Sequence, residues 1–287
     1  MNTPATATAE AQRLLFGRPA CDYLATCHES GVLTRTPDGD FCAGDAPDPL
    51  TRTARYFVEY AQPRLLTSPT GPGRLPAAAP PSAEVVLRSP ADTRLPAPWQ
   101  PLLTYLVRTG PAATAVPQGA GHTTTAEDDG ISPATAADEP LVQRWMELAI
   151  SDASVHQTGT RALDGAVREQ AGLILGQPGR LSLIARADGR PIGHATLDQE
   201  AHDDITGVRF LELIDILVDP EHDVRAVTAR LTQAAIERAD RLGLPLVGHV
   251  VHQQAAPEHG PRIIASLTAR GWQPLWVYWR HPAKDAR

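Results

Sequence analysis

The sequence lacks any run of the roughly 18–20 apolar residues that a membrane-spanning helix needs, so we predict no transmembrane segment. Residues 1–10 are small and polar and lack the basic region of a signal peptide. Cysteine is scarce: Cys21, Cys27 and Cys42 form no CxxC pair, which is typical of reduced thiols and argues against a zinc site. We therefore expect a cytoplasmic protein that binds no metal.

Positive charge is also limited. Lys284 is the only lysine, and the formal net charge is −7. This balance disfavours a broad nucleic-acid-binding surface, although arginines could still form a local patch. The 287 residues, 42% hydrophobic and 21% charged, indicate a soluble globular protein with one large or two modest domains.

A strand, a tight turn, a helix and a second strand stand out in the second half of the chain. Residues 209–218 are apolar and β-branched, and Asp219-Pro220 ends this strand. From about Val224 the apolar residues follow helical spacing until Gly243, and residues 244–251 form another apolar run. The two strands should lie parallel, and the N–H groups at the helix N-terminus should form an anion site beside a strand end.

This segment resembles the core of the GNAT (Gcn5-related N-acetyltransferase) superfamily. In that family a strand with a Val-x-Pro-like ending leads into an Arg/Gln-x-x-Gly-x-Gly/Ala loop. Val218 and Pro220 fit the first pattern; in the loop, Asp223 stands at the Arg/Gln position, Ala226 at the first glycine and Thr228 at the last Gly/Ala. The resemblance implies acetyl-CoA or another acyl-CoA as co-substrate. The residues that it implies for binding are Ile216, Leu217, Val218, Asp223, Val224, Arg225, Ala226, Val227 and Thr228.

The order of the predicted elements extends the resemblance over residues 131–287. A strand and helix from Ile131, a helix at 162–175, a hairpin at 181–197 and a final helix and strand at 262–280 follow the family's order. The implied fold class is α/β, a GNAT-like mixed central sheet flanked by helices and preceded by a smaller α+β N-terminal region. We place an accessory region at 1–110, a linker rich in Pro, Gly and Thr at 111–130, and the GNAT-like domain at 131–287.

The N-terminal region matches no family, and the sequence shows no internal repeat. Its patterns predict a hairpin at 34–41, a helix at 50–62, a loop at 67–81, a strand at 84–88 and a helix at 99–107. Such a region could form a lid, the arm of a homodimer or part of the acceptor pocket. Because members of the family often build acceptor specificity outside the core, we expect it to pack against the cleft.

Two carboxylates lie in the predicted strand. The resemblance implies that Glu212 is the general base, since histone-type members carry theirs at this position. Burial in an apolar run would raise the pKa of this carboxyl toward neutrality, whereas an exposed Glu212, or one paired with Arg209, would have no such role. By two-residue alternation Asp215 should face away from Glu212, which favours a structural hydrogen bond over catalysis.

The tyrosine with which many family members protonate the leaving thiolate is missing, because counting back from Gly271-Trp272 places Leu267 at its position. His249 and His252, at the end of the second strand of the unit, are candidate acids or bases. The alternative is that each is an ordinary strand-end histidine. Other polar residues nearby in the sequence are Ser266, Thr268 and Tyr278. A further candidate histidine, His194, lies in the predicted hairpin.

The predicted phosphate loop carries an unusual charge. Asp223 suits a helix N-terminus, but its carboxylate repels phosphate and can occupy the N–H groups itself. Arg225 could offset this repulsion through a phosphate contact. The alternative is that Asp223 only caps the helix and that the loop binds no nucleotide.

Two functional classes follow. The first is an N-acyltransferase of specialised metabolism that acylates a small-molecule amine, with acyl-CoA, a phosphopantetheinyl carrier protein or an aminoacyl-tRNA as donor. The second is a catalytically degenerate GNAT-like protein that binds a ligand or partner. Glu212 and the loop spacing favour the enzyme, while Leu267 and Asp223 favour the binding protein. The acidic net charge argues against a tRNA donor.

Overall fold

The computed structural model describes residues 10–14, 17–20, 22–108 and 130–283. Apart from Gly130, the predicted linker at 111–130 lies outside the described residues. The N-terminal half contains α2 (Tyr23–Glu29), β1 (Leu33–Thr34), β2 (Phe41–Asp45), β3 (Arg55–Ala61), α3 (Pro63–Thr67), α4 (Gly71–Ala78), β4 (Glu84–Pro90) and β5 (Gln100–Arg108). The C-terminal half contains β6 (Ile131–Pro133), α5 (Glu139–Thr158), α6 (Asp164–Leu175), β7 (Arg180–Ala187), β8 (Arg190–Asp198), β9 (His202–Asp203), β10 (Val208–Arg209), β11 (Leu211–Val218), α7 (Val224–Leu242), β12 (Leu246–Val251), α8 (His259–Thr268) and β13 (Trp272–His281).

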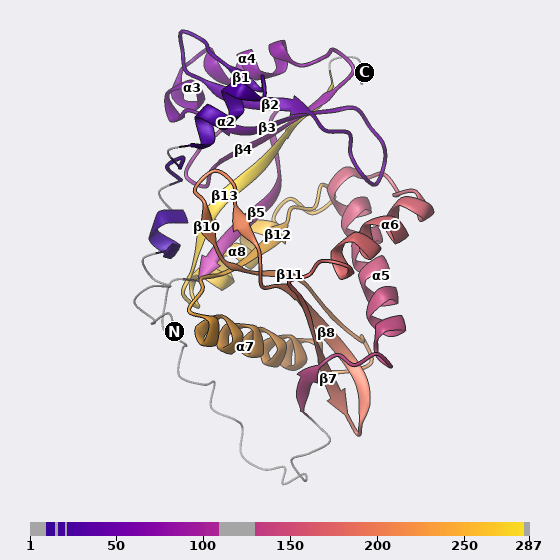
Figure 1. Ribbon diagram of the computed structural model, residues 1–287. Coiled ribbons are helices and arrows are strands. Elements are labelled where there is room, and N and C mark those ends of the chain that lie inside the picture. The colour runs from indigo at the N-terminus through magenta and orange to yellow at the C-terminus, as the bar shows by residue number, and fades with distance from the viewer. Residues whose placement is uncertain (1–9, 15–16, 21, 109–129, 284–287) are drawn as a thin grey trace.

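Strands from both halves form one eleven-stranded sheet (Figure 1). Its order is β1-β2-β3-β4-β13-β5-β12-β11-β8-β7-β6, and β9 and β10 form a separate two-stranded sheet. Strand β5 of the N-terminal half lies between β12 and β13, and β13 of the C-terminal half lies between β4 and β5. The predicted mixed sheet flanked by helices is confirmed, but the described strands of the N-terminal region continue this sheet and form no separate one.

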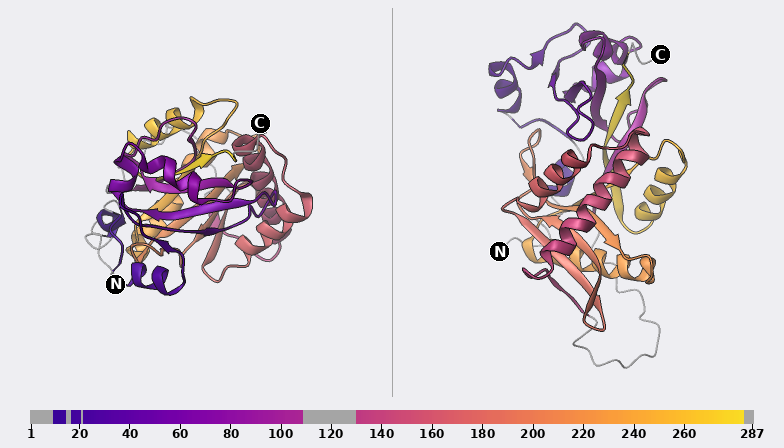
Figure 2. Two further views of the ribbon diagram at one scale, coloured as in Figure 1. Left: turned by 90° about the horizontal axis from the view of Figure 1, so that it is seen from above. Right: turned by 90° about the vertical axis from the view of Figure 1, so that its right-hand side faces the viewer.

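Helices cover the two faces of the C-terminal strands. Helix α7 packs on one face, where Leu211, Leu231 and Val250 belong to the same apolar cluster. Helix α5 packs on the other face through Val142 and Trp145. The right-hand view of Figure 2 shows α5 and α6 side by side in front of the strands. The alternation of side chains along each strand therefore decides whether a residue faces α7 or α5.

The elements predicted for the C-terminal half are confirmed. The β11–α7–β12 unit has the expected parallel strand pair, and Gly243 ends α7 in a left-handed conformation with φ of 64°. The hairpin is β7 and β8, the second helix is α6, and the final helix and strand are α8 and β13. Apolar periodicity was informative here because these helices are long and amphipathic.

Two helices predicted for the N-terminal half are wrong. Most of residues 50–62 form β3, which pairs with β2 and β4, and residues 99–107 fall almost entirely in β5. Short apolar runs fit either structure, and pairing with strands distant in the sequence decides between them. The predicted loop at 67–81 contains α4, whereas the hairpin at 34–41 and the strand at 84–88 are confirmed.

The two halves repeat one strand topology. In the N-terminal half β1–β2 and β2–β3 are antiparallel and β3–β4 is parallel. In the C-terminal half β7–β8 and β8–β11 are antiparallel and β11–β12 is parallel. Each parallel pair is then followed by an antiparallel strand donated by the other half, β13 beside β4 and β5 beside β12. The repeat lies in the topology, and the sequence did not reveal it.

None of the helices in the described part of the chain combines the length and hydrophobicity that crossing a membrane requires. Cys27 and Cys42 are buried free thiols, in agreement with the prediction of reduced cysteines. Cys21 lies outside the described residues.

Candidate active site at the divergence of β11 and β12

The site is built where two parallel strands separate. Strands β11 and β12 pair only from Leu211 to Leu213, although β11 continues to Val218 and β12 to Val251. At the same point the pairing of β11 with β8 shifts register, so Ile214 is the extra residue of a β-bulge. Backbone groups beyond the last paired residues have no ladder partner across this gap, and they are available to a ligand that enters it.

The bulge corrects the prediction that Asp215 faces away from Glu212. Leu213 pairs with Leu197 and Asp215 with the next residue, Thr196, so the extra residue reverses the alternation. Glu212 and Asp215 consequently lie on the same face, the one covered by α5. The sequence pattern could not show this, because a bulge is defined by the pairing partner.

Glu212 is partly buried and lies directly opposite Asp198 of β8. Burial and, to a smaller extent, the Asp198 carboxylate raise the pKa of Glu212 to about 7, against the opposing effect of a hydrogen bond from Tyr105. The Glu212 carboxyl is therefore desolvated and not fully exposed to solvent. A carboxyl with this pKa can both accept and release a proton near pH 7.

Tyr105 comes from β5 of the N-terminal half and was not predicted as a site residue. It pairs with His249 of β12, and the two rings lie 5.3 Å apart. Burial raises the pKa of the Tyr105 phenol well above its usual range, and the Glu212 charge raises it further. The hydroxyl therefore stays protonated and donates to Glu212. No local sequence signal marks Tyr105, because its role depends on the pairing of β5 with β12.

Asp215 lies among buried rings. His194 Nε2 is 3.5 Å from Asp215 Oδ2, and the His194 ring stacks on Trp145 with centroids 5.2 Å apart. Burial lowers the pKa of His249, and the Asp215 charge opposes this shift. Among the described residues, the buried atoms His194 Nε2, Asp215 Oδ2 and His249 Nδ1 have no hydrogen-bond partner. His249 is therefore neutral at pH 7 and can accept or relay a proton.

His252 lies apart from this group. Its Nε2 is 2.8 Å from Thr104 Oγ1, and its ring lies against Gly260, where an added Cβ would come within 2.6 Å of Nδ1. Burial lowers the pKa of His252. These contacts give His252 a packing role, and its predicted catalytic role stays a prediction.

The predicted phosphate loop is capped by its own aspartate. Asp223 accepts a hydrogen bond of 3.0 Å from the Ala226 N–H, so this N–H is already occupied. Arg225 is exposed beside it. The other residues predicted to bind the co-substrate lie nearby. Ile216 and Val218 of β11 pack with Val227 between the sheet and α7, and Leu217 lies on the α5 face of the sheet. Val224 and Thr228 lie in the first turns of α7.

A pocket of about 280 Å³ opens beside Glu212. Its lining includes the carboxylates of Asp198, Glu200 and Glu212, together with the backbone-rich turn around Gly179. Three acidic groups at one pocket favour a positively charged ligand. Among the described residues, no group of three or more His, Cys, Asp or Glu side chains is arranged to hold a metal ion.

Residues 143–257 match the model of the acetyltransferase (GNAT) family. The C-terminal half of this chain carries a GNAT domain. The matched segment of the GNAT domain runs from α5 to beyond β12 and includes Glu212, Asp215 and His249. Tyr105 lies outside it, so the site combines residues of the GNAT domain with one from the N-terminal half.

Several solved structures are similar to this chain. An acetyltransferase of the GNAT family from Colwellia psychrerythraea has 9% identity and a TM-score of 0.47, with 98% of this chain and 97% of that chain covered. A GCN5-related N-acetyltransferase from Sphaerobacter thermophilus has 13% identity and a TM-score of 0.44, with 85% and 76% covered. The aminoglycoside N-acetyltransferase AAC(6')-Iy in complex with CoA has 20% identity and a TM-score of 0.34, with 51% and 92% covered. No curated protein matches the chain.

Proposed function

We propose that this protein is an N-acyltransferase that moves an acyl group from acyl-CoA to a small, positively charged amine. The observation that carries the proposal is Glu212: a carboxyl whose pKa is raised to about 7 lies one residue before the point where β11 and β12 diverge. A base with this pKa can take the proton that an amine nitrogen loses as it attacks a thioester. The matched GNAT family supports the acyl transfer.

The bulge supports stabilisation of the reaction intermediate. Attack on a thioester carbonyl places negative charge on its oxygen, which needs hydrogen-bond donors. Ile214 is the extra residue of the bulge, and an extra residue is left out of the strand ladder. Its backbone lies next to the gap between β11 and β12, so a carbonyl placed there would meet a donor that the fold holds in position.

Tyr105 supports a complete path for the proton. The amine first loses its ammonium proton to solvent; the nitrogen then forms a bond to the carbonyl carbon, the carbon–sulfur bond breaks, and the second proton that the nitrogen must lose moves to Glu212. Tyr105 then gives its hydroxyl proton to the leaving thiolate and receives the proton held by Glu212 through their hydrogen bond. One proton has passed from nitrogen to sulfur, and both side chains have returned to their starting states. This relay would replace the tyrosine that Leu267 cannot supply.

The acidic pocket beside Glu212 supports the choice of acceptor. Asp198 and Glu200 would attract an amine that carries positive charge, and Glu212 would then remove a proton from the nitrogen that reacts. Acyl-CoA is the proposed donor, as the GNAT match suggests. Because Asp223 opposes a pyrophosphate near α7, a phosphopantetheinyl carrier protein is the alternative donor.

A binding protein without acyltransferase activity is the second candidate. It is favoured by one observation, the occupation of the Ala226 N–H by the Asp223 carboxylate. An aminoacyl-tRNA donor is disfavoured, since a net charge of −7 repels the RNA backbone.

Calorimetry with acetyl-CoA, followed by an acceptor screen over mono- and polyamines, tests the proposal. We expect acetyl-CoA to bind and a cationic amine to be acetylated at a rate that Glu212→Gln lowers by about 10²–10⁴-fold. Binding without turnover of any amine would favour the binding protein. The absence of binding by acetyl-CoA, combined with acyl transfer from a holo carrier protein, would identify the alternative donor.

A further inference from the structure

The N-terminal half contains a second divergence of parallel strands. Strands β3 and β4 pair only as far as Val58 and Leu87, although both continue beyond these residues. The pairing of β3 with β2 shifts register between Val58 and Tyr60, so Glu59 is the extra residue of a bulge. In the repeated topology Glu59 therefore corresponds to Ile214, and the gap that follows it corresponds to the gap between β11 and β12.

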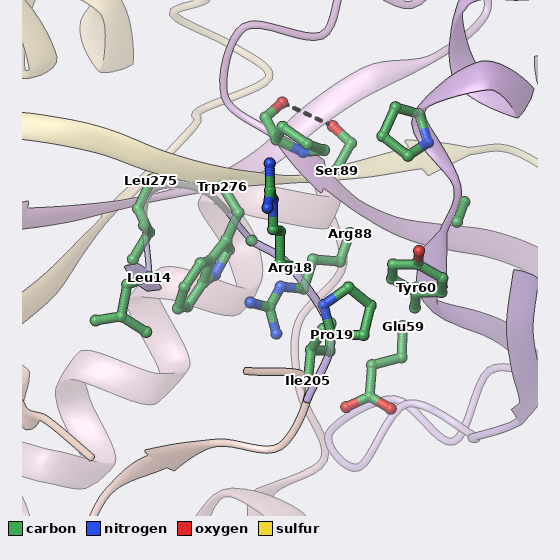
Figure 3. Close-up of a pocket in the computed structure, with 14 residues that line it drawn as sticks. Leu14, Arg18, Pro19, Glu59, Tyr60, Arg88, Ser89, Ile205, Leu275 and Trp276 are labelled. Carbon is green, nitrogen blue, oxygen red and sulfur yellow. Dashed lines mark hydrogen bonds between the residues drawn. The ribbon is translucent and has the colours of Figure 1, made fainter. Parts of the chain in front are cut away.

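A pocket of about 320 Å³, here called the N-terminal pocket, lies at this second divergence. It is lined by residues 59–61 of β3 and 88–90 of β4, on either side of the gap. Figure 3 shows Leu14, Leu275 and Trp276 on one side, Glu59 and Tyr60 on the other, and the side chains of Arg18 and Arg88 between them. The pocket therefore has apolar walls, two cationic groups and the Glu59 carboxylate, and it is large enough for a small organic ligand.

Several polar groups in this pocket are suited to a ligand. Arg88 donates to Asp203 at 2.6 Å and lies over the Trp276 ring at 3.8 Å, so it is held rigidly. Arg18 is exposed and makes no ion pair with any described residue. Among the described residues, the buried Trp276 Nε1 has no hydrogen-bond partner. An anion could pair with Arg18, while an acceptor oxygen could receive the Trp276 N–H.

The gap itself favours a linear ligand with amide groups. Beyond Val58 and Leu87 the backbones of β3 and β4 no longer pair with each other. An extended chain between them could replace the missing ladder with its own N–H and C=O groups, in the way that a peptide adds to a sheet edge. The lining also includes three prolines, Pro19, Pro63 and Pro90, which contribute no N–H donors.

The N-terminal pocket has no carboxylate at the position that corresponds to Glu212. Glu212 precedes Leu213, the last residue of β11 that pairs with β12, and the corresponding residue before Val58 is Phe57. Phe57 stacks on Tyr278 with ring centroids 5.9 Å apart, where the other half has the contact of Glu212 with Tyr105. A phenyl ring cannot accept a proton, so no base stands at the position of Glu212, and the Glu59 carboxylate of the pocket already accepts a hydrogen bond of 3.0 Å from the Tyr23 hydroxyl.

We propose that the N-terminal pocket is a second, non-catalytic binding site for a linear amide-bearing chain with an anionic end, the chemistry of 4′-phosphopantetheine. The pantetheine chemistry rests on the donor proposed for the first site; the existence of a site rests on the pocket alone. The ligand's amides lie between β3 and β4, its anionic group pairs with Arg18, and its apolar end lies against Leu275 and Trp276.

Calorimetry of the full chain with 4′-phosphopantetheine and with CoA tests this proposal. We expect two binding events for the wild type. Arg18→Glu reverses an exposed charge, and Pro19→Trp fills the pocket from its wall. Each variant should weaken binding at the N-terminal pocket by at least about tenfold, while the other binding event persists. Arg225→Glu, at the start of α7, is the matched control and should weaken only the other event. Circular dichroism confirms that the variants fold.

The outcomes separate the two proposals. Binding that neither Arg18→Glu nor Pro19→Trp weakens would overturn the N-terminal site, whatever the activity of Glu212→Gln. A single event that Pro19→Trp removes and Arg225→Glu leaves intact would support the N-terminal site and overturn the proposed donor site near α7. Comparison of a holo carrier protein with its apo form then distinguishes a carrier-bound ligand from free CoA, since only the holo form presents the pantetheine chain.

Discussion

The hydroxyl of Tyr105 and the carboxylate of Glu212 are hydrogen-bonded across strand β12, although they come from different halves of the chain. The contact exists because β5 pairs with β12 and brings Tyr105 beside His249, two residues along β12 from the Glu212–Val247 pair. A fragment that contained only the GNAT domain would lack this phenol and would expose one edge of β12. The candidate active site therefore requires both halves.

Replacement of Glu212 tests the proposed base. We expect Glu212→Gln to lower kcat by about 10²–10⁴-fold, because an amide cannot accept the amine proton. The wild-type rate should rise with pH through about 7, as Glu212 loses its proton, and the variant should lose this dependence. Rates across the neutral pH range provide the measurement. Glu200→Gln, an exposed carboxylate at the same pocket, should keep the pH dependence; an unchanged profile in Glu212→Gln would contradict the assignment.

Replacement of Tyr105 tests the relay. The Tyr105 hydrogen bond lowers the pKa of Glu212, so Tyr105→Phe should shift the rise in rate to higher pH. It should also lower kcat by about 10²-fold if the phenol protonates the thiolate. Tyr56→Phe, on β3 and away from Glu212, is the control. A Tyr105→Phe enzyme with lowered kcat but an unshifted pH profile would argue for a packing role alone.

The raised pKa of Glu212 also predicts how stability depends on pH. Folding raises this pKa from 4.5 to about 7, so between these values the folded chain binds more protons than the unfolded chain. The free energy of unfolding should therefore fall as pH rises through this window, by up to about 3 kcal/mol from this group. Thermal unfolding at mildly acidic and neutral pH, compared with Glu212→Gln, measures the contribution. A difference in the free energy of unfolding between the two proteins that does not change with pH would contradict a buried Glu212 carboxyl.

The Asp223 cap can be separated from the Asp223 charge. Asp223→Ala should lower the free energy of unfolding by about 1 kcal/mol, because the Ala226 N–H loses its acceptor. Asp223→Asn keeps an acceptor and should retain most of this stability. Both variants remove the charge that repels phosphate, so both should bind CoA more tightly than the wild type. Denaturant unfolding and calorimetry on the same samples provide the two measurements, and equal CoA affinity in all three proteins would show that the ligand does not approach this loop.

The Asp215 carboxylate should raise the pKa of His249. Its charge opposes the effect of burial on the His249 pKa, so Asp215→Asn should lower that pKa further. NMR titration of the histidine ring protons provides the measurement. Asp219→Asn, just beyond the end of β11, should leave the His249 titration unchanged. An unaltered pKa in Asp215→Asn would show that the two groups do not interact.

The sequence predicted the C-terminal half well because its elements carry strong local signals. Helix α7 is long and amphipathic, Gly243 marks its end, and the spacing from Val218 to Thr228 is intact. The N-terminal half was harder, since β3 and β5 are short apolar segments whose structure depends on strands far away in the chain. The prediction of a helix in each case followed the local pattern and missed the pairing.

The sequence by itself determined the fold class, the βαβ unit and the presence of Glu212 in its first strand, because periodicity and turn residues act over a few positions. Only the tertiary structure decided which groups meet Glu212. The bulge at Ile214 turned Asp215 to the same face, and the insertion of β5 beside β12 supplied Tyr105. Both depend on hydrogen bonds between strands that are distant in the sequence, and no local pattern encodes the register of such a pairing.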